Sequence, residues 1–353
     1  MGILHSYLFR SVFSMTCLVL LVLIALGAFI EFLSQIEQIG TGGYDLFIAA
    51  QYVLLKLPRL AFGILPVSIL IGALIGLGVL ASNSELIVFR AAGVSLWRMA
   101  NSLAITGLTI AIIGGAIGEL IAPKLDLYAR QIRAEAMHGG NADLNGSNAW
   151  IRDGNTFFNI QPIVDDLDRG GVYSFEIDFP NAISSMGRAD SIQADGDDWT
   201  LVGMIESTFV GDKILNEGDV NVEQFRKLGD LLSISIVRES NMTAIELYRY
   251  IQYLESNDLN SGKYIIAFWS RMANLVGIVV MCILALPFLF GNLRSSGAGA
   301  RTMVGILIGL GYFLMNRTLA DSAAVFNLYP LFVAWMPTIL LTAVTFLLLA
   351  RLR

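Results

Sequence analysis

The side chains that most often catalyse reactions or bind metals are scarce in this chain of 353 residues. Its two histidines, His5 and His138, have no partner at metal-ligand spacing, and His138 is expected to be a surface turn residue. Cys17 and Cys282 lie in apolar runs, which argues against a disulfide framework. The sequence contains no P-loop, no G-x-S-x-G and no H-E-x-x-H. We therefore expect no catalysis by this chain alone, no cofactor and no metal site.

The most unusual polar residues lie in "SNSELIVFRAAGVSLWRMA", residues 82–100, between two apolar runs. Ser82 and Glu85 have the spacing of a capping box, which predicts a helix over residues 82–98. Arg90 lies away from the apolar stripe of this helix. The stripe consists of Leu86, Phe89, Gly93 and Leu96.

Two interpretations of this helix remain open. In the first, it lies at the membrane interface and its arginines meet lipid headgroups. In the second, it is a coupling helix that docks into a groove on a cytoplasmic ATPase through its apolar stripe and Glu85. Composition alone favours the first interpretation.

The elements that carry these residues are expected to be membrane spans. Hydrophobic residues make up 55% of the chain and charged residues 15%, and the mean hydropathy is +0.66. A helical span takes about 20 apolar residues. The predicted fold class is therefore an α-helical integral membrane protein with six transmembrane helices. These are expected at residues 11–30, 60–81, 103–122, 268–290, 303–326 and 331–349.

Arginines in the short flanks and loops predict the orientation of the spans. The first apolar run is longer than a normal signal peptide and has no clean cleavage site after it, so we expect it to be retained. Both termini are expected in the cytoplasm, and residues 35–57 and about 123–263 outside. The flanking basic residues on the cytoplasmic side are His5, Arg10, Arg90, Arg98, Arg294, Arg301, Arg351 and Arg353.

The large insert between the third and fourth spans is acidic and is predicted to be all-β. "AWIRDGNTFFNI" and "SIQADGDDWTLVG" each place a Gly/Asp turn between short strand-like stretches. In "GGVYSFEIDF" the residues Tyr173, Phe175 and Ile177 share one parity, as in a half-buried strand. A sandwich or jellyroll fits this pattern. A helix is expected from about residue 241 toward the fourth span. The predicted division is a membrane half over 1–137, a β domain over 138–239, and a connecting helix with the second membrane half over 240–353.

Several stretches resemble the LptF/LptG permease family, the membrane subunits of the lipopolysaccharide exporter. "LIGALIGLGVLASNSELIVFRAAGVSLWRM" resembles the stretch of that family that contains an S-E-L motif and a following A-x-G. "GTGGYD" and "FGNLRS" are more similar to the G-type subunit than to its F-type partner. The other stretches that keep the family order are "IGELIAPKLDLYARQIRAEAMHGG", "WIRDGNTFFNI", "GKYIIAFWSRM" and "LPFLFGNLRSSGAGAR".

The resemblance implies a permease without enzymatic activity in the inner membrane of a Gram-negative bacterium. Its expected fold has six spans and a periplasmic β-jellyroll between the third and fourth. Its expected partners are an F-type permease subunit, a homodimeric cytoplasmic ATPase, a single-span periplasmic bridge component and the periplasmic bridge; no nucleic acid is implied. Lipopolysaccharide is the expected cargo, extracted from the outer leaflet of the inner membrane, and ATP is used by the ATPase alone. The coupling-helix contacts would be Glu85, Leu86, Phe89 and Arg90.

A site for a multi-acyl lipid with phosphates needs an apolar wall and basic groups at headgroup level. The resemblance assigns this role to Arg59, before the second span, and to Arg130 and Arg133, after the third. Snorkelling toward the interface or salt bridging within the protein is an equally open interpretation of each.

Further candidates lie inside the predicted spans. Arg317 is expected either in the transport cavity or paired with Asp321 one helical turn away. Where some relatives have lysines near the end of the first span, this chain has Glu31; it would bind lipid through a divalent cation or pair with a base such as Arg59. The acyl-facing candidates, for which packing roles also remain open, are Phe29, Phe32 and Phe62.

Two classes of function remain at this point. The first is a transport permease driven by a partner ATPase. The second is a membrane-anchored periplasmic adaptor or assembly factor without transport activity of its own. Replacement of Glu85 distinguishes them, because it should uncouple ATP hydrolysis from export in the permease and be nearly silent in the adaptor.

Overall fold

The computed structural model divides into two compact units. The first comprises Met1–Ile39, Asp45–Gln131 and Gly262–Arg353, and the second comprises Gly40–Tyr44 and Ile132–Ser261. The predicted domain boundaries stay predictions, and the one at 239/240 lies outside the described residues. The structure describes residues 2–138, 149–153, 155–160, 171–178, 182–189, 191–195, 198–210, 213–217, 224–225, 242–257, 259–290, 297–326 and 328–352.

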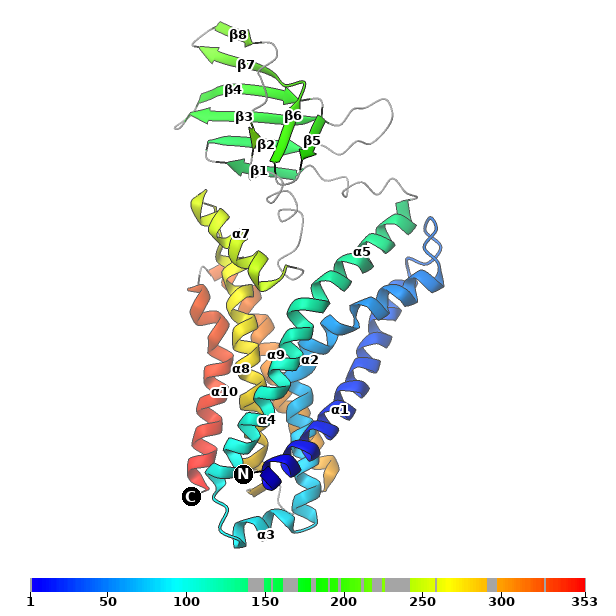
Figure 1. Cartoon of the computed structure of the whole chain (residues 1–353), viewed down its shortest axis with the longest axis vertical. Helices are drawn as coiled ribbons and strands as arrows, with labels where there is room; N and C mark the ends of the chain where they lie inside the picture. Colours follow the sequence, from blue (N-terminus) through cyan, green and yellow to red (C-terminus); the bar gives the residue numbers. More distant parts are fainter. Residues whose placement is uncertain are drawn as a thin grey trace. The chain divides into compact units, whose positions relative to one another are not determined.

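The first unit is a bundle of long apolar helices (Figure 1). Among the described residues, six helical segments are long and apolar enough to cross a membrane, which confirms the six predicted spans. The second span begins at Leu46 and not at residue 60, and the third begins at Leu96. The helices are α1 (Gly2–Ile36), α2 (Leu46–Ser82), α3 (Glu85–Ala91), α4 (Leu96–Ala116), α5 (Ala122–His138), α8 (Gly262–Phe290), α9 (Ala298–Phe326) and α10 (Pro330–Arg351).

The third span contains one turn of π-helix, η1 (Ile117–Ile121), between α4 and α5. The backbone N–H of Ala122 donates to the carbonyl of Ile117, five residues earlier. The next residue, Pro123, has no N–H, so it cannot make the usual bond to the carbonyl of Glu119. The wider turn accommodates the proline and lets the helix continue to His138. The prediction that His138 is a surface turn residue is wrong, because His138 is the last residue of α5.

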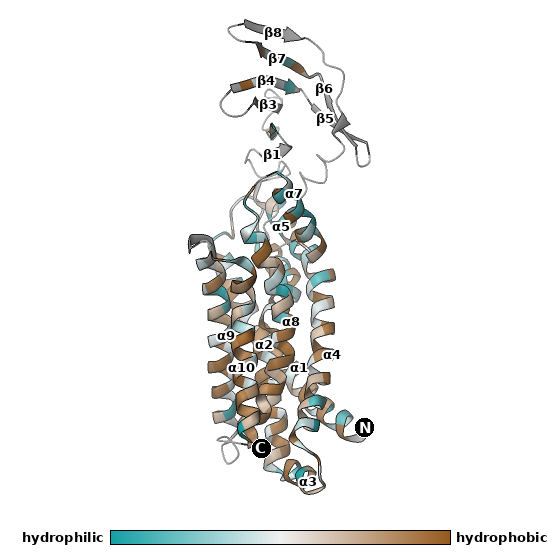
Figure 2. Cartoon of the chain, turned by 90° about the vertical axis from the view of Figure 1, so that its left-hand side faces the viewer, coloured by the Kyte–Doolittle hydropathy of each residue, from teal (hydrophilic) through white to brown (hydrophobic). Residues whose placement is uncertain are grey.

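Two helices form the inside of the bundle. In the most apolar 18-residue stretch of each helix, 72% of the residues of α2 and 61% of those of α8 are buried. The corresponding shares are 11% in α1 and 17% in α9. Figure 2 shows hydrophobic residues predominating along the bundle helices. The outer helices therefore expose broad apolar surfaces, which suits contact with lipid or with another membrane protein.

The glycines of α2 bring it close to α1. A Cβ atom added to Gly72 would lie 2.5 Å from the Cα of Thr16, and one added to Gly76 would lie 2.8 Å from the carbonyl oxygen of Ser11. The Ser11 hydroxyl donates to the carbonyl of Gly76 at 3.1 Å. The Gly-x-x-x-Gly spacing thus serves packing within this chain.

Within its described residues, the second unit contains two antiparallel sheets, the end of α5 from Ile132 onward, and the helix α7 (Ala244–Ser256). The larger sheet has the order β1-β2-β3-β4-β7-β8, and the smaller has the order β5-β6-β9. The predicted hairpins are confirmed, since Asp153 pairs with Thr156 and Asp195 with Asp198. The strands are β1 (Ala149–Asp153), β2 (Thr156–Ile160), β3 (Val172–Asp178), β4 (Ala182–Ala189), β5 (Ser191–Asp195), β6 (Asp198–Val202), β7 (Ile205–Val210), β8 (Lys213–Glu217) and β9 (Gln224–Phe225).

The buried face of β3 differs from the prediction. Val172 and Ser174 are 4% and 6% exposed. Tyr173, on the opposite parity, lies under the guanidinium of Arg188, 5.6 Å from ring centroid to Cζ. Gly187 lies opposite Ser174 on the neighbouring strand and leaves room for its hydroxyl, so this small polar residue can occupy the buried face.

Candidate functional site

A cavity opens between three helices of the first unit. Its volume is about 280 Å³. Lys56 and Arg59 contribute cations from α2, and Glu31 contributes an anion from α1. The remaining walls are mainly apolar and include Phe313 of α9. The other lining residues are Ala28, Val53, Leu57, Leu60, Gly63 and Ile64.

The sequence of α2 explains why its two cations share this cavity. The helix begins at the N-cap Asp45, whose carboxylate accepts from the N–H of Ile48 at 2.9 Å. Lys56 and Arg59 are three residues apart, so they lie on one face of the helix. Pro58, between them, interrupts the ladder of backbone hydrogen bonds, and α2 changes direction along its length (Figure 1).

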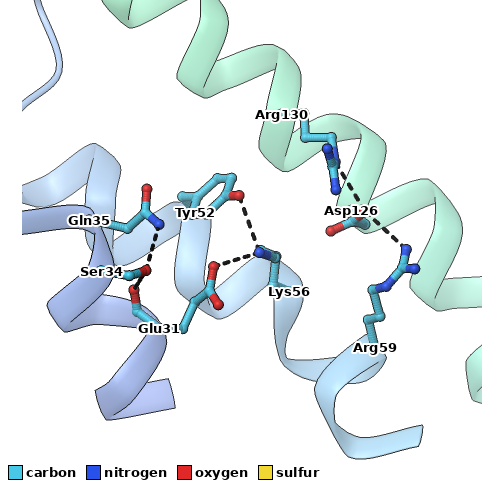
Figure 3. Close-up of polar contacts among 8 residues, drawn as sticks. All are labelled: Glu31, Ser34, Gln35, Tyr52, Lys56, Arg59, Asp126 and Arg130. Atoms are coloured by element: carbon cyan, nitrogen blue, oxygen red, sulfur yellow. Dashed lines mark hydrogen bonds and ion pairs between the residues drawn. The ribbon is translucent and has the colours of Figure 1, made fainter. Parts of the chain in front are cut away.

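Lys56 is held by an ion pair between two helices (Figure 3). Its Nζ donates to Oε1 of Glu31 at 2.5 Å and to the hydroxyl of Tyr52 at 3.2 Å. The Nζ also lies 4.9 Å from the centroid of the Tyr52 ring. Of the two alternatives for Glu31, the structure shows pairing with a base, and that base is Lys56.

Arg59 belongs to a second charged cluster, which joins α2 to α5 (Figure 3). Its Nη1 lies 3.1 Å from Oδ2 of Asp126, and Nε of Arg130 lies 3.2 Å from the same oxygen. Asp126 is fully buried, and its other oxygen, Oδ1, has no hydrogen-bond partner among the described residues. The arginines are 30% and 40% exposed, so solvent or a ligand can reach them.

The charges of the described residues in the two clusters do not cancel. Lys56, Arg59 and Arg130 carry three positive charges, and Glu31 and Asp126 carry two negative ones, which leaves one net positive charge among these five side chains. An ammonium and a guanidinium on one helix face, beside apolar walls, can bind a phosphate that is attached to an apolar molecule. Such a phosphate would have to compete with the two carboxylates already in place.

A further ion pair stabilises the π-helix. Nη1 of Arg271, on α8, lies 3.0 Å from Oε1 and 3.1 Å from Oε2 of Glu119. Both side chains are mostly buried. Within the same turn, a Cβ atom on Gly118 would overlap the ring of Phe62, so this glycine lets η1 lie directly against α2. The pair joins the third span to the fourth at η1, where the backbone hydrogen-bonding pattern of the third span changes.

The other residues predicted to contact lipid lie in different places. Phe29 is 58% exposed on α1, as an acyl-facing residue would be. Phe32 packs beside Tyr52 and Ala129 of the chain itself, and Phe62 lies on Gly118. Contact of these two rings with acyl chains stays a prediction. Arg133 lies one turn beyond Arg130 on α5 and belongs to the second unit.

Arg317 is exposed on α9 and does not line the cavity. Its predicted partner is four residues along the same helix. The side chain of Asp321 lies outside the described residues, and the pair therefore stays a prediction.

The predicted coupling segment is two helices and not one. The helix α3 has seven residues, and a turn with Gly93 at φ +85° separates it from α4. The capping box is absent, because Ser84 is the N-cap with φ 65° and makes no side-chain cap. The hydroxyl of Ser82 donates instead to the carbonyl of Val79.

The apolar stripe of α3 faces the chain's own core. Leu86 is 2% exposed, and Phe89 packs against the same core and against the ring of Tyr7. The structure therefore does not present Leu86 to a docking partner, contrary to the prediction. The outward side carries Arg90 and the apolar residues Ile87 and Val88, 44% and 62% exposed.

Glu85 lies where the first turns of α1 meet α3. Its Oε2 accepts a hydrogen bond of 2.6 Å from the hydroxyl of Tyr7, and its Oε1 accepts one of 3.4 Å from Asn83. Of the predicted contacts, Glu85 and Arg90 thus remain available at the surface.

The prediction missed two central residues of the site. Lys56 falls in a stretch that was expected to be an outer loop, although its spacing of three from Arg59 would have placed both on one helix face. Asp126 was not considered, although its spacing of four from Arg130 predicts an ion pair.

The chain is similar along almost its whole length to known permeases. A family model described as lipopolysaccharide export system permease LptF/LptG matches residues 6–351. The lipopolysaccharide export system permease protein LptG of Escherichia coli (strain K12) is 30% identical over 342 residues, which cover 96% of this chain and 95% of that protein. The protein of the same name from Haemophilus influenzae (strain ATCC 51907 / DSM 11121 / KW20 / Rd) is 30% identical over 353 residues, or 99% of both chains.

Proposed function

The chain belongs to the lipopolysaccharide export system permease family LptF/LptG, and we propose that its cavity between α1, α2 and α9 receives the phosphorylated headgroup of lipopolysaccharide. Full-length similarity to LptG proteins makes it an LptG-like, multi-pass inner-membrane permease. The observation that carries the headgroup proposal is the placement of Lys56 and Arg59 side by side in a cavity with mainly apolar walls.

The size of the cavity limits which part of the lipid it receives. A volume of about 280 Å³ lies just below the range of about 300–1,000 Å³ that is usual for small-molecule sites. It suits one phosphorylated sugar and is too small for several acyl chains. The chains would lie on the exposed apolar surfaces of α1 and α9, which include Phe29, Leu26 and Leu310.

Binding of a phosphate would exchange partners within the two charged clusters. The phosphate would take the place of Glu31 at Lys56 and share Arg59 with Asp126. Because both ion pairs join separate helices, this exchange would loosen α1 from α2 and α2 from α5. Lipid entry would thereby be linked to movement of the helices around the cavity.

The energy for transport would come from a separate ATPase. The sequence has no P-loop, and α3 offers Glu85, Arg90 and the exposed Ile87 and Val88 as a small docking face. In this proposal the ATPase is a cytoplasmic homodimer that binds one α3 from this chain and one from an F-type permease. The chain itself catalyses no reaction and needs no cofactor.

The β-strands would receive the lipid on the periplasmic side. In the described part of the larger sheet, β1 and β8 are the edge strands. Edge strands leave backbone N–H and C=O groups free to pair with another sheet. We propose that one edge continues into the periplasmic bridge of a Gram-negative cell and that the chain therefore has its β-strands in the periplasm.

Binding of fluorescent lipopolysaccharide to the purified permease complex in detergent tests the cavity. The Lys56→Glu and Arg59→Glu double variant should bind at least about tenfold more weakly, because two charge-assisted contacts become repulsive. Lys124→Glu, an exposed cation on α5 outside the cavity, is the matched control. Equal binding by the double variant and the control would place the headgroup elsewhere.

A further inference from the structure

Two buried hydrogen bonds join α8, α9 and α10 inside the first unit. Tyr312, on α9, and Thr338, on α10, are 6% and 1% exposed. Their hydroxyl oxygens lie 3.0 Å apart, and the Thr338 hydroxyl donates to the carbonyl of Ala273, on α8, at 3.2 Å. Because the single hydroxyl hydrogen of Thr338 points to Ala273, the hydroxyl of Tyr312 donates to Thr338. The three helices are therefore connected by a directed chain of hydrogen bonds.

α8 has a glycine where the tyrosine reaches it. A Cβ atom on Gly277 would lie 2.5 Å from the hydroxyl oxygen and 3.2 Å from Cζ of Tyr312. Any larger residue at position 277 would therefore displace the ring. Gly277 is one helical turn after Ala273, whose carbonyl is the last acceptor of the chain of hydrogen bonds. α8 thus supplies both the space for the tyrosine and the acceptor to which its hydrogen bonds lead.

Glycines make the close contact between α9 and α2. A Cβ atom on Gly305 would lie 3.0 Å from Cγ1 of Ile71, and one on Gly309 would lie 2.6 Å from Cγ1 of Val67. Glycines let two helices approach closely, but they have no side chain that interlocks with the neighbouring helix. Such a contact resists separation of the helices more than rotation of one against the other. The hydrogen bonds of Tyr312 depend on direction, so they can fix the rotation of α9 about its own axis.

The rotation of α9 sets the position of the next residue, Phe313. This residue forms the α9 wall of the cavity and is 40% exposed. Successive residues of an α-helix point about 100° apart. While Tyr312 is directed toward α8 and α10, Phe313 is thus directed toward the cavity. A rotation of α9 that released Tyr312 would also move Phe313 relative to Lys56 and Arg59.

We propose that Tyr312 is a positioning residue, which holds α9 in the rotational setting at which Phe313 closes the cavity around a bound headgroup. The proposal rests on the proposed function of the cavity as the headgroup site. Tyr312 does not line the cavity and acts through Phe313 alone. Without its hydroxyl, α9 gains a second setting, in which the cavity holds the headgroup less tightly.

Fluorine NMR at position 313 tests the setting of α9 without any lipopolysaccharide. 4-Fluorophenylalanine replaces Phe313 in the full-length chain of the permease complex, purified in mild detergent. The otherwise unchanged chain should give a single resonance. Tyr312→Phe keeps the ring and Thr338→Val keeps the side-chain shape, and each should give a second resonance from the second setting. The double variant should add little to either single variant, because both changes break the same chain of hydrogen bonds.

Thr345→Val is the matched control. Thr345 lies on α10 like Thr338 and is 4% exposed, but its hydroxyl donates to the carbonyl of Leu341 within its own helix. Its replacement removes a buried hydroxyl without breaking the bond between α10 and α9, so a single resonance should remain. A second resonance in Thr345→Val, or an unchanged spectrum in Tyr312→Phe or Thr338→Val, would overturn the proposal.

Binding of fluorescent lipopolysaccharide, with Phe313 intact, measures the consequence for the headgroup. Tyr312→Phe should weaken binding about two- to tenfold, because loss of one buried hydrogen bond lowers the population of the binding setting. Thr345→Val should bind like the wild-type chain. Equal binding by Tyr312→Phe and the wild-type chain would overturn the positioning role.

The Lys56→Glu and Arg59→Glu double variant separates this proposal from the proposed function. It should lose lipopolysaccharide binding and keep the single fluorine resonance, because the hydrogen bonds of Tyr312 are intact. Normal lipopolysaccharide binding by this variant would refute the headgroup site. Failure of the fluorine prediction would instead refute the role of Tyr312 and leave the headgroup site standing.

Discussion

Replacement of Glu31 by Gln should strengthen the binding of lipopolysaccharide. The carboxylate of Glu31 holds Lys56 in an ion pair of 2.5 Å, and a lipid phosphate must displace it. The two side chains are 22% and 32% exposed, so screening reduces their net coupling to about 0.5–1.5 kcal/mol. With 1.4 kcal/mol per factor of ten, Glu31→Gln should tighten binding by about two- to tenfold.

Lys56→Met is the opposite change at the same pair. It keeps most of the side-chain volume and removes the charge. Loss of one charge-assisted contact should weaken binding about tenfold or more. Titration of fluorescent lipopolysaccharide into the purified permease complex measures both variants in one assay, and Lys124→Met is the control.

The reverse result for Glu31 has a specific meaning. If Glu31→Gln weakens binding, and EDTA weakens binding by the wild-type chain to the same degree, then Glu31 contacts the lipid through a divalent cation. The competition between Glu31 and the phosphate would then be refuted.

Three further changes test the packing around the site. Asp126→Asn should lower the free energy of unfolding by about 1–3 kcal/mol, measured by thermal unfolding in detergent, because two arginines lose their shared carboxylate; an unchanged melting temperature would contradict this. Gly72→Leu should prevent α2 from reaching α1 and abolish the folded chain on size exclusion, whereas Gly311→Ala, which has open space around it, should be tolerated. Val88→Asp should leave the chain folded but prevent an ATPase from co-purifying with it, whereas Leu86→Asp should unfold the chain. Co-purification of the ATPase with the Val88→Asp chain would show that α3 is not part of the interface.

The spans and the hairpins could be predicted because each depends on local sequence. A run of about 20 apolar residues has few structures open to it other than a membrane helix. The Asp153 and Asp195 turns likewise fix their hairpins within a few residues. Resemblance to a family then supplied a function that no residue pattern in this chain could specify.

The ends of the helices and the partners of the charges could not be predicted in the same way. α2 begins 14 residues before the predicted span, because its first turns are only partly apolar. Arg271 and Glu119 are 152 residues apart, so their pairing depends on how two spans pack. Which side of α3 faces inward depends on the position of α1, because Tyr7 of α1 contacts Glu85 of α3 and Leu8 of α1 lies in the core. This arrangement is also not a local property of the sequence.

Photocrosslinking of lipopolysaccharide during ATP-driven export tests the central claim most directly. A photoreactive amino acid replaces Leu60 in the cavity, and another replaces Leu347, which is 67% exposed on α10. We predict an ATP-dependent crosslink to lipopolysaccharide at Leu60 that is lost when Lys56 and Arg59 are both replaced by Glu, and no such dependence at Leu347. A crosslink at Leu60 that persists in the charge-reversed chain, or none at Leu60 during active export, would contradict binding of the headgroup in this cavity.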